Sequence, residues 1–149
     1  MYTVKTQISF EAAHRLYDVN TYSAECRENL HGHSYKVNVE VTSGESTNSA
    51  GMVVDFKLLK NALKEVEDQY DHSCILKAND PLCEPIKANC KKVFRVMENP
   101  TAEWMAKHLF NEIFCALRRN NIYDVELYKV EVQETENNIA CYIREEGNK

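Results

Sequence analysis

The chain has 149 residues, which suits one domain with a single core over residues 1–149. Its formal net charge is -5 and it has no run of lysine and arginine, so neither nucleic acid nor an acidic membrane surface is an expected partner. Met1 leads straight into an alternating segment, without the pattern of a secretory leader and without an apolar run of about 18 residues. We therefore expect a cytoplasmic protein that does not enter membranes.

Two segments in the first third of the chain alternate between apolar and polar residues. They cover residues 2–10 and residues 33–41. This period of two predicts two half-buried strands. Strands that follow one another along the chain are neighbours about two-thirds of the time, so we expect these two to pair.

Two helices are predicted after these strands. Asp55 is a plausible N-cap for a helix that ends near Tyr70. The second helix begins in Asn99-Pro100-Thr101, where Asn99 or Thr101 can cap and Pro100 suits the first turn. The expected apolar stripes are Phe56, Leu59, Leu63 and Val66 in the first helix, and Met105, Leu109, Ile113, Ala116 and Leu117 in the second.

The last quarter of the chain predicts two more strands. They cover residues 125–134, with Tyr128, Val130 and Val132 on one face, and residues 139–144. Residues 73–98 are irregular, although VFRV is a possible short strand. The pattern predicts an α+β fold in which a four-stranded antiparallel sheet has two helices on one face.

The six cysteines form no C-x-x-C pair, so a disulfide framework or a zinc ribbon has little support. Cys115 and Cys141 fall inside apolar patterns. We expect both to be small core residues.

Two histidines, His31 and His33, stand at the start of the second predicted strand. Alternation points both imidazoles to one face, and Gly32 between them leaves room for a close ligand. The pair is compatible either with a metal site or with ordinary hydrogen bonding. His14 follows the first predicted strand and would lie beside them if the two strands pair. Three neutral imidazoles would leave one position of a zinc ion open, as in catalytic sites.

Three further polar residues stand out. Glu134 is two residues beyond Val132, so alternation places its carboxylate on the apolar face of Val130 and Val132, where burial without a partner would be costly. Glu134 is therefore either solvated beyond the end of the strand or binds a ligand edge rich in hydrogen-bond donors. Asp71 precedes His72 directly, and an aspartate can hold a histidine in one tautomer for acid/base work. Such a dipeptide also arises by chance.

Six pieces spread over nearly the whole chain form a recognisable set. They are FEAAHRL, LHGHSYKVNVEV, GMVVDFKLLK, DHS, NPTAEWMAKHLF and VEVQETENNIACY. Together they resemble the 6-pyruvoyltetrahydropterin synthase family, which includes the 6-carboxytetrahydropterin synthases of queuosine synthesis. The resemblance implies the tunnelling fold, in which trimers join their sheets into a barrel, two trimers form a homohexamer, and active sites lie between subunits.

The resemblance also implies site roles. His14, His31 and His33 would bind Zn²⁺, and Asp71 and His72 would join the proton-transfer machinery. The carboxylate of Glu134 would accept hydrogen bonds from the N–H edge of the pterin, and Thr101 would lie at the pterin pocket. The implied substrate is 7,8-dihydroneopterin triphosphate.

The identity of the base decides the product. Members that use cysteine have C-x3-HGH in the queuosine branch or C-x5-HGH in the biopterin branch, whereas Cys26 gives C-x4-HGH. Glu28 gives E-x2-HGH, the arrangement of a branch that cleaves the side chain by a retro-aldol step to 6-hydroxymethyl-7,8-dihydropterin, a folate precursor. We favour Cys26, because EAAHRL, VDFKLLK and NPTAE resemble the queuosine-type enzymes.

Two other classes are compatible with parts of the pattern. A non-catalytic protein that binds zinc or pterin on this fold would keep the histidines but would not need Glu134, Asp71 and His72 together. A relative that acts on GTP or a deazapurine would carry other metal and nucleophile motifs. Incubation with dihydroneopterin triphosphate would separate these classes, whereas zinc analysis would not.

Overall fold

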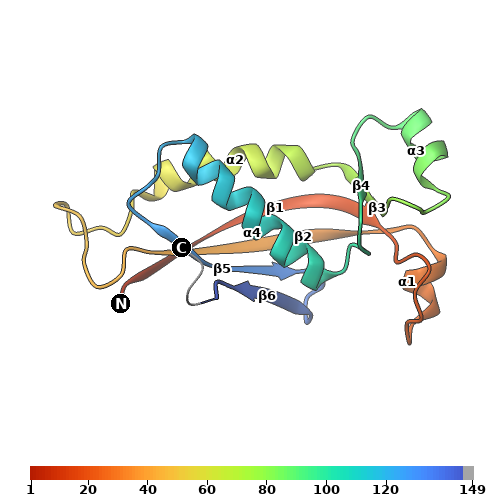
Figure 1. The fold of residues 1–149 in the computed structure, drawn as a ribbon, viewed down its shortest axis with the longest axis horizontal. Coiled ribbons are helices and arrows are strands. Elements are labelled where there is room, and N and C mark those ends of the chain that lie inside the picture. Colours follow the sequence, from red (N-terminus) through yellow and green to blue (C-terminus); the bar gives the residue numbers. More distant parts are fainter. Residues whose placement is uncertain (146–149) are drawn as a thin grey trace.

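The computed structural model describes residues 1–145, which form a mixed sheet with helices across one face (Figure 1). The strands are β1 (Thr3–His14), β2 (His31–Thr42), β3 (Ser73–Lys77), β4 (Val93–Val96), β5 (Glu126–Gln133) and β6 (Ile139–Ile143). The helices are α1 (Ala24–Glu28), α2 (Phe56–Tyr70), α3 (Cys83–Asn89) and α4 (Ala102–Arg119). The α+β class is therefore confirmed.

The sheet has six strands in the order β4-β3-β1-β2-β5-β6, so the prediction of four antiparallel strands was wrong in number. β1, β2, β5 and β6 are antiparallel, whereas β3 runs parallel to both β1 and β4. The possible strand VFRV is β4. β3 escaped prediction because four successive residues, 73–76, are buried. A strand that is covered on both faces has no alternating pattern.

Helices α2 and α4 lie across the same face of the sheet and supply most of its apolar cover (Figure 1). Asp55 caps α2 by accepting hydrogen bonds from the backbone N–H groups of Lys57 and Leu58, as predicted. Phe56 was wrongly placed in the buried stripe, because the first turn of α2 leaves it 49% exposed. None of the four described helices is both long and apolar enough to cross a bilayer.

The start of α4 differs from the prediction in one respect. Thr101 is the N-cap, and its hydroxyl accepts a hydrogen bond from the N–H of Trp104 at 3.1 Å. Pro100 therefore precedes the cap instead of occupying the first turn. Its carbonyl group is left free to bind a side chain outside the helix.

The pairing of β5 with β2 contains an irregularity that changes which residues face the core. Glu40 pairs with Lys129, but the next residue of β2, Val41, pairs with Leu127. Tyr128 is thus the extra residue of a bulge. Leu127 is buried in its place, which corrects the predicted face of this strand.

The cysteines are all free thiols. Cys115 and Cys141 are both exposed, so their expected place in the core was wrong. Each lies in an apolar stretch but on the outer side of its element, since the neighbours Ala116 and Tyr142 carry the contacts with the core.

Candidate active site

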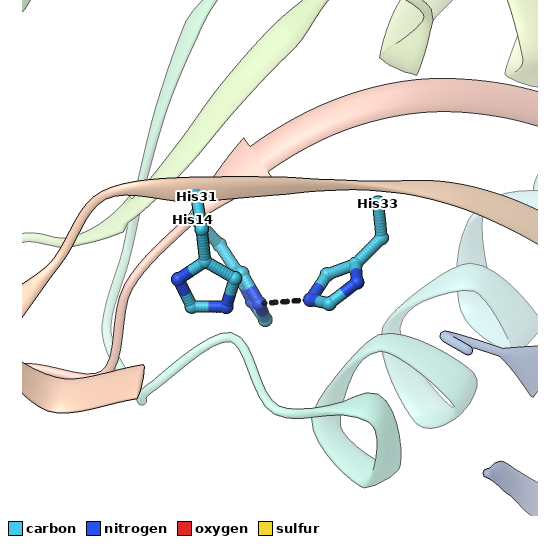
Figure 2. Close-up of side chains that lie close together, drawn as sticks. All are labelled: His14, His31 and His33. Carbon is cyan, nitrogen blue, oxygen red and sulfur yellow. Dashed lines mark hydrogen bonds between the residues drawn. The ribbon is translucent and has the colours of Figure 1, made fainter. Parts of the chain in front are cut away.

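The three predicted histidines come together through the pairing of β1 with β2. In this register His14 lies opposite His31, and Ala12 lies opposite His33. Residues opposite one another share a face, and so do residues two apart in one strand. Figure 2 shows the three imidazoles pointing into one space, and their ligand nitrogens all lie within 4.8 Å of one another.

Backbone carbonyl groups fix the orientation of two of these rings. Nδ1–H of His14 donates to the carbonyl of Pro100 at 2.7 Å, and Nδ1–H of His31 donates to the carbonyl of Asn29 at 2.9 Å. In the neutral tautomer that makes these bonds, Nε2 of each ring carries a lone pair. Carbonyl groups that accept a hydrogen bond from the other ring nitrogen orient histidine ligands in metal sites in this way.

Burial favours the neutral form of two of the three rings. It lowers the pKa of His14 from 6.5 to about 4, and the neighbouring His31 and His33 add to this effect. Burial also lowers the pKa of His33, against the opposing influence of the Glu134 carboxylate. Neutral imidazole is the form that binds a metal ion.

The donor set fits a zinc ion. Nε2 of His14 and Nε2 of His33 are 3.1 Å apart (Figure 2). Two ligands of a tetrahedral zinc, each at about 2.0–2.1 Å from the metal, are roughly 3.3 Å from each other. A cation bound by both rings would accept the Nε2 lone pairs of His14 and His33, which otherwise face one another. Three imidazoles leave one position open, which is the pattern of catalytic zinc.

Gly32 also serves a purpose other than the one predicted. A Cβ atom at this position would lie 3.3 Å from the backbone oxygen of Ala12. It would point to the face of the sheet opposite the imidazoles, because side chains alternate along a strand. Gly32 therefore allows close packing of β1 and β2, and it lines a cavity of about 390 Å³ together with His33 and His72.

A cavity of about 480 Å³ opens beside the histidines. Its walls come from β1, α1, the start of α4 and the turn between β5 and β6, and include His14, Cys26, Thr101, Glu103, Glu134 and Asn138. The structure thus brings together one zinc-ligand candidate, one base candidate and both residues expected near the substrate.

Glu134 lies at the histidine end of this cavity. Its Oε1 is 3.5 Å from Nε2 of His14 and 3.7 Å from Nε2 of His33. The residue comes directly after β5, and its N–H donates to the carbonyl of Asn138, which closes the turn to β6. Glu134 therefore faces the cluster and is not a solvated residue beyond the strand.

The two candidate bases have different surroundings. Cys26 lines the cavity and is partly buried. The side chain of Glu28 is 64% exposed and pairs with Arg27 at 3.2 Å. Glu28 does not line the cavity, although only Arg27 separates it from Cys26 in the sequence.

Asp71 and His72 lie between α2 and β3, outside this cavity. One carboxylate oxygen of Asp71 accepts a hydrogen bond from the N–H of Glu11 at 2.9 Å, and the other lies 2.8 Å from Nδ1 of His72. These contacts hold the pKa of Asp71 below its usual value. His72 is 80% exposed and has a positive φ of 61°, a conformation that is rare for a residue with a side chain.

Sequence reasoning missed two contributors to the site. Glu103 was given no role at the site, yet it lines the cavity beside Thr101. Pro100 was interpreted only as a helix-start residue, yet its carbonyl orients His14. The position of Glu103 two residues after Thr101 was a usable signal for the first, whereas a carbonyl contact across 86 residues leaves no signal in the sequence.

Known proteins are similar to this one over nearly the whole chain, including every residue of the candidate site. Residues 3–145 match the model of the family described as 6-pyruvoyl tetrahydropterin synthase. The 6-carboxy-5,6,7,8-tetrahydropterin synthase of Rickettsia conorii is 37% identical over 111 residues, 72% of this chain and 77% of that protein. The enzyme of the same name from Aquifex aeolicus is 36% identical and covers 91% of this chain and 94% of its own. The structure of Caenorhabditis elegans 6-pyruvoyl tetrahydropterin synthase has a TM-score of 0.66 and 30% identity, and covers 97% of this chain and 96% of its own.

The histidine cluster predicts the metal content of the protein. We expect about one zinc ion per chain, and we expect His31→Ala to lose it, because two imidazoles bind far more weakly than three. His108→Gln is the matched control, since His108 lies 2.6 Å from the Tyr70 hydroxyl, away from the cluster. Metal analysis after gel filtration measures this. Full zinc content in His31→Ala would rule out the assigned ligands.

Proposed function

Because the chain belongs to the 6-pyruvoyl tetrahydropterin synthase family, we propose that it is a zinc-dependent lyase of the 7,8-dihydroneopterin triphosphate side chain. Triphosphate leaves during the reaction. To reach the one-carbon 6-carboxy substituent, the other two carbons of the three-carbon side chain leave as a two-carbon aldehyde, and water supplies one carboxylate oxygen. The main product is 6-carboxy-5,6,7,8-tetrahydropterin, because the relatives from Rickettsia and Aquifex carry that name. The corresponding 6-pyruvoyl product is the nearest alternative.

His14, His31 and His33 hold the zinc ion in this proposal. When bound, the ion supplies Lewis-acid stabilisation of negative charge that develops on side-chain oxygens of the substrate. The carbonyl groups of Pro100 and Asn29 keep two of the rings in the ligating tautomer. The cavity beside the cluster takes the pterin.

Cys26 is the base that removes a proton from the substrate side chain. The observation that supports this most strongly is that Cys26 shares the cavity with His14 and Glu134, whereas the Glu28 carboxylate is exposed and paired with Arg27. A base must come within hydrogen-bond reach of the proton that it takes. The one-residue departure from the C-x3-HGH and C-x5-HGH spacings is absorbed by the short helix α1.

The two candidate bases predict different products. Cys26→Ala should lower formation of the 6-carboxy product by more than about 100-fold, the usual effect of removing a general base. Glu28→Ala should stay within about threefold of wild type, since exposed ion pairs contribute little. Chromatography of the reaction with dihydroneopterin triphosphate, with product identification by mass, measures both. Wild-type rates in Cys26→Ala together with an inactive Glu28→Ala would assign the protein to the retro-aldol branch.

Two carboxylates are available to the substrate. Glu134 was assigned to the N–H edge of the pterin, but its contact with two imidazoles favours a role at the reacting side chain, as acceptor of a hydroxyl proton. Glu103 lines the same cavity from the first turn of α4. It is the alternative acceptor for the pterin ring. A carboxylate that accepts two N–H bonds contributes about 1.5–3 kcal/mol per bond.

A ligand without the reacting side chain distinguishes these roles. If Glu134 binds the ring, Glu134→Gln should weaken the binding of 6-methyl-7,8-dihydropterin by about 10-fold or more, because a charge-assisted bond is lost. If Glu103 is the ring acceptor, Glu103→Gln should weaken the binding of 6-methyl-7,8-dihydropterin by that amount. Glu134→Gln should then lower only the rate of turnover. Fluorescence titration of the two variants, both with full zinc content, measures this. We expect the second pattern, and unchanged ring affinity in both variants would refute both assignments.

Asp71 and His72 serve the active site of a neighbouring subunit in a homohexamer. Within one chain they lie outside the cavity of Cys26, yet Asp71 orients the His72 ring and leaves it 80% exposed. The unfavourable φ of His72 is held by its own N–H, which donates to the carbonyl of Glu11 at 2.7 Å. Strain of this kind is typical of functional residues. An acid/base pair that is preorganised but faces outward fits a site completed by a second copy.

Mixed oligomers test this arrangement. Cys26→Ala and His72→Ala should each be inactive, but after joint refolding about a quarter of the sites would combine an intact Cys26 with an intact His72 from another chain. Activity should recover to that extent. A mixture of Cys26→Ala with the double variant Cys26→Ala/His72→Ala is the control and should stay inactive. No recovery in oligomers that native mass spectrometry shows to be mixed would contradict a shared site.

A further inference from the structure

The segment that carries Cys26 has little support of its own. Residues 15–23 form neither helix nor strand in the described chain, and none of the five residues of α1 is buried. A helix this short is not stable on its own hydrogen bonds. The position of Cys26 therefore depends on the contacts that residues 15–23 make with the rest of the fold.

Asn99 makes such a contact with both backbone groups of Tyr17. Its Oδ1 accepts a hydrogen bond from the N–H of Tyr17 at 2.7 Å, and its Nδ2 donates to the carbonyl of Tyr17 at 3.0 Å. These partners fix the orientation of the amide, because the N–H can only donate and the carbonyl can only accept. We call this pair of bonds the Asn99 clamp.

The Asn99 clamp is coupled to Cys26 through one residue. Leu16, the neighbour of Tyr17, donates its N–H to the carbonyl of Cys26 at 2.9 Å. Leu16 and Cys26 both line the active-site cavity, whereas Asn99 lines a separate hollow beside Trp104. Asn99 thus acts on the site through the backbone of residues 16 and 17.

The residues that follow Asn99 fix two other parts of the site. The carbonyl of Pro100 orients His14, and Thr101 caps α4 at the cavity wall. The carbonyl of Asn99 accepts a hydrogen bond from the N–H of Thr101 at 2.8 Å, so the three residues form one turn. The backbone that carries Cys26 and the ring of His14 are therefore held by the same short segment.

We propose that Asn99 is a positioning residue, which sets the distance between the Cys26 thiol and the histidine cluster through the Asn99 clamp. This inference rests on the proposed function, in which Cys26 is the base. An amide is required, because an aspartate keeps the bond to the Tyr17 N–H but turns a second oxygen toward the Tyr17 carbonyl.

The test compares Asn99→Ala and Asn99→Asp with Asn120→Ala in the full-length, zinc-loaded protein. Asn120 is the matched control, since its amide makes one local bond to the carbonyl of Ala116 at the other end of α4. Misplacement of a reacting group by about 1 Å costs up to about 100-fold in rate, so kcat should fall about 10- to 100-fold in both Asn99 variants, with KM and zinc content little changed. Asn120→Ala should retain the wild-type kcat.

A second measurement reports on Cys26 without relying on catalysis. Alkylation by iodoacetamide, followed at the Cys26 peptide by mass spectrometry, should become about threefold faster or more in the Asn99 variants, because a released segment opens more often. The exposed Cys141 is the internal reference and should react at an unchanged rate. The isosteric Asn99→Asp keeps the test available if the alanine variant does not fold.

The outcomes separate this inference from the proposed function. A lower kcat with wild-type alkylation at Cys26 would overturn it, as would faster alkylation with wild-type kcat. If Cys26→Ala itself stays fully active, the base assignment fails and the positioning role fails with it. We expect slower turnover together with faster alkylation of Cys26 in both Asn99 variants. In Asn120→Ala we expect both rates to equal those of the wild type.

Discussion

The register between β1 and β2 is the constraint on which the rest of the site depends. It sets His14 opposite His31 and Ala12 opposite His33, and a slip of one residue would turn one strand's side chains to the other face. The same register continues into the core, where Tyr35 and Val37 follow His33 on the covered face. The hydrophobic packing under α2 and α4 therefore fixes the position of the imidazoles. The histidine cluster therefore lies at the polar end of the hydrophobic core, on the same strands that form this core.

Contacts from distant parts of the chain complete what this register begins. The turn at residues 99–101 orients one imidazole and holds the segment of Cys26, and the turn after β5 brings Glu134 to the cluster. Each of these groups comes from a loop at one end of the sheet. A rigid sheet with functional loops at its end allows the base and the carboxylates to vary while the histidines stay fixed.

Much of this arrangement was predictable because it follows local periodicity. Alternation identified β1 and β2, and helical spacing with Asp55 and Thr101 as caps identified α2 and α4. From the two strands alone, the meeting of His14 with His31 and His33 followed. β3 gave no alternating signal because it is buried on both faces, and the bulge at Tyr128 depends on how β2 and β5 meet, which no local pattern records. The sequence could not choose between Cys26 and Glu28, because their positions relative to the cavity depend on the path of α1 in space.

The three histidines that could hold a metal ion lie close together along the chain, and this has a consequence for the order of assembly. All three lie between residues 14 and 33, and closing a loop of that length has a small entropic cost. Much of the cavity wall, by contrast, comes from residues 101–103 and 134–140. During synthesis on the ribosome, the pairing of β1 with β2 can therefore bring the three histidines together well before the cavity exists. Metal capture by the nascent chain would then stabilise the first strand pair and favour the correct register for the strands that emerge later.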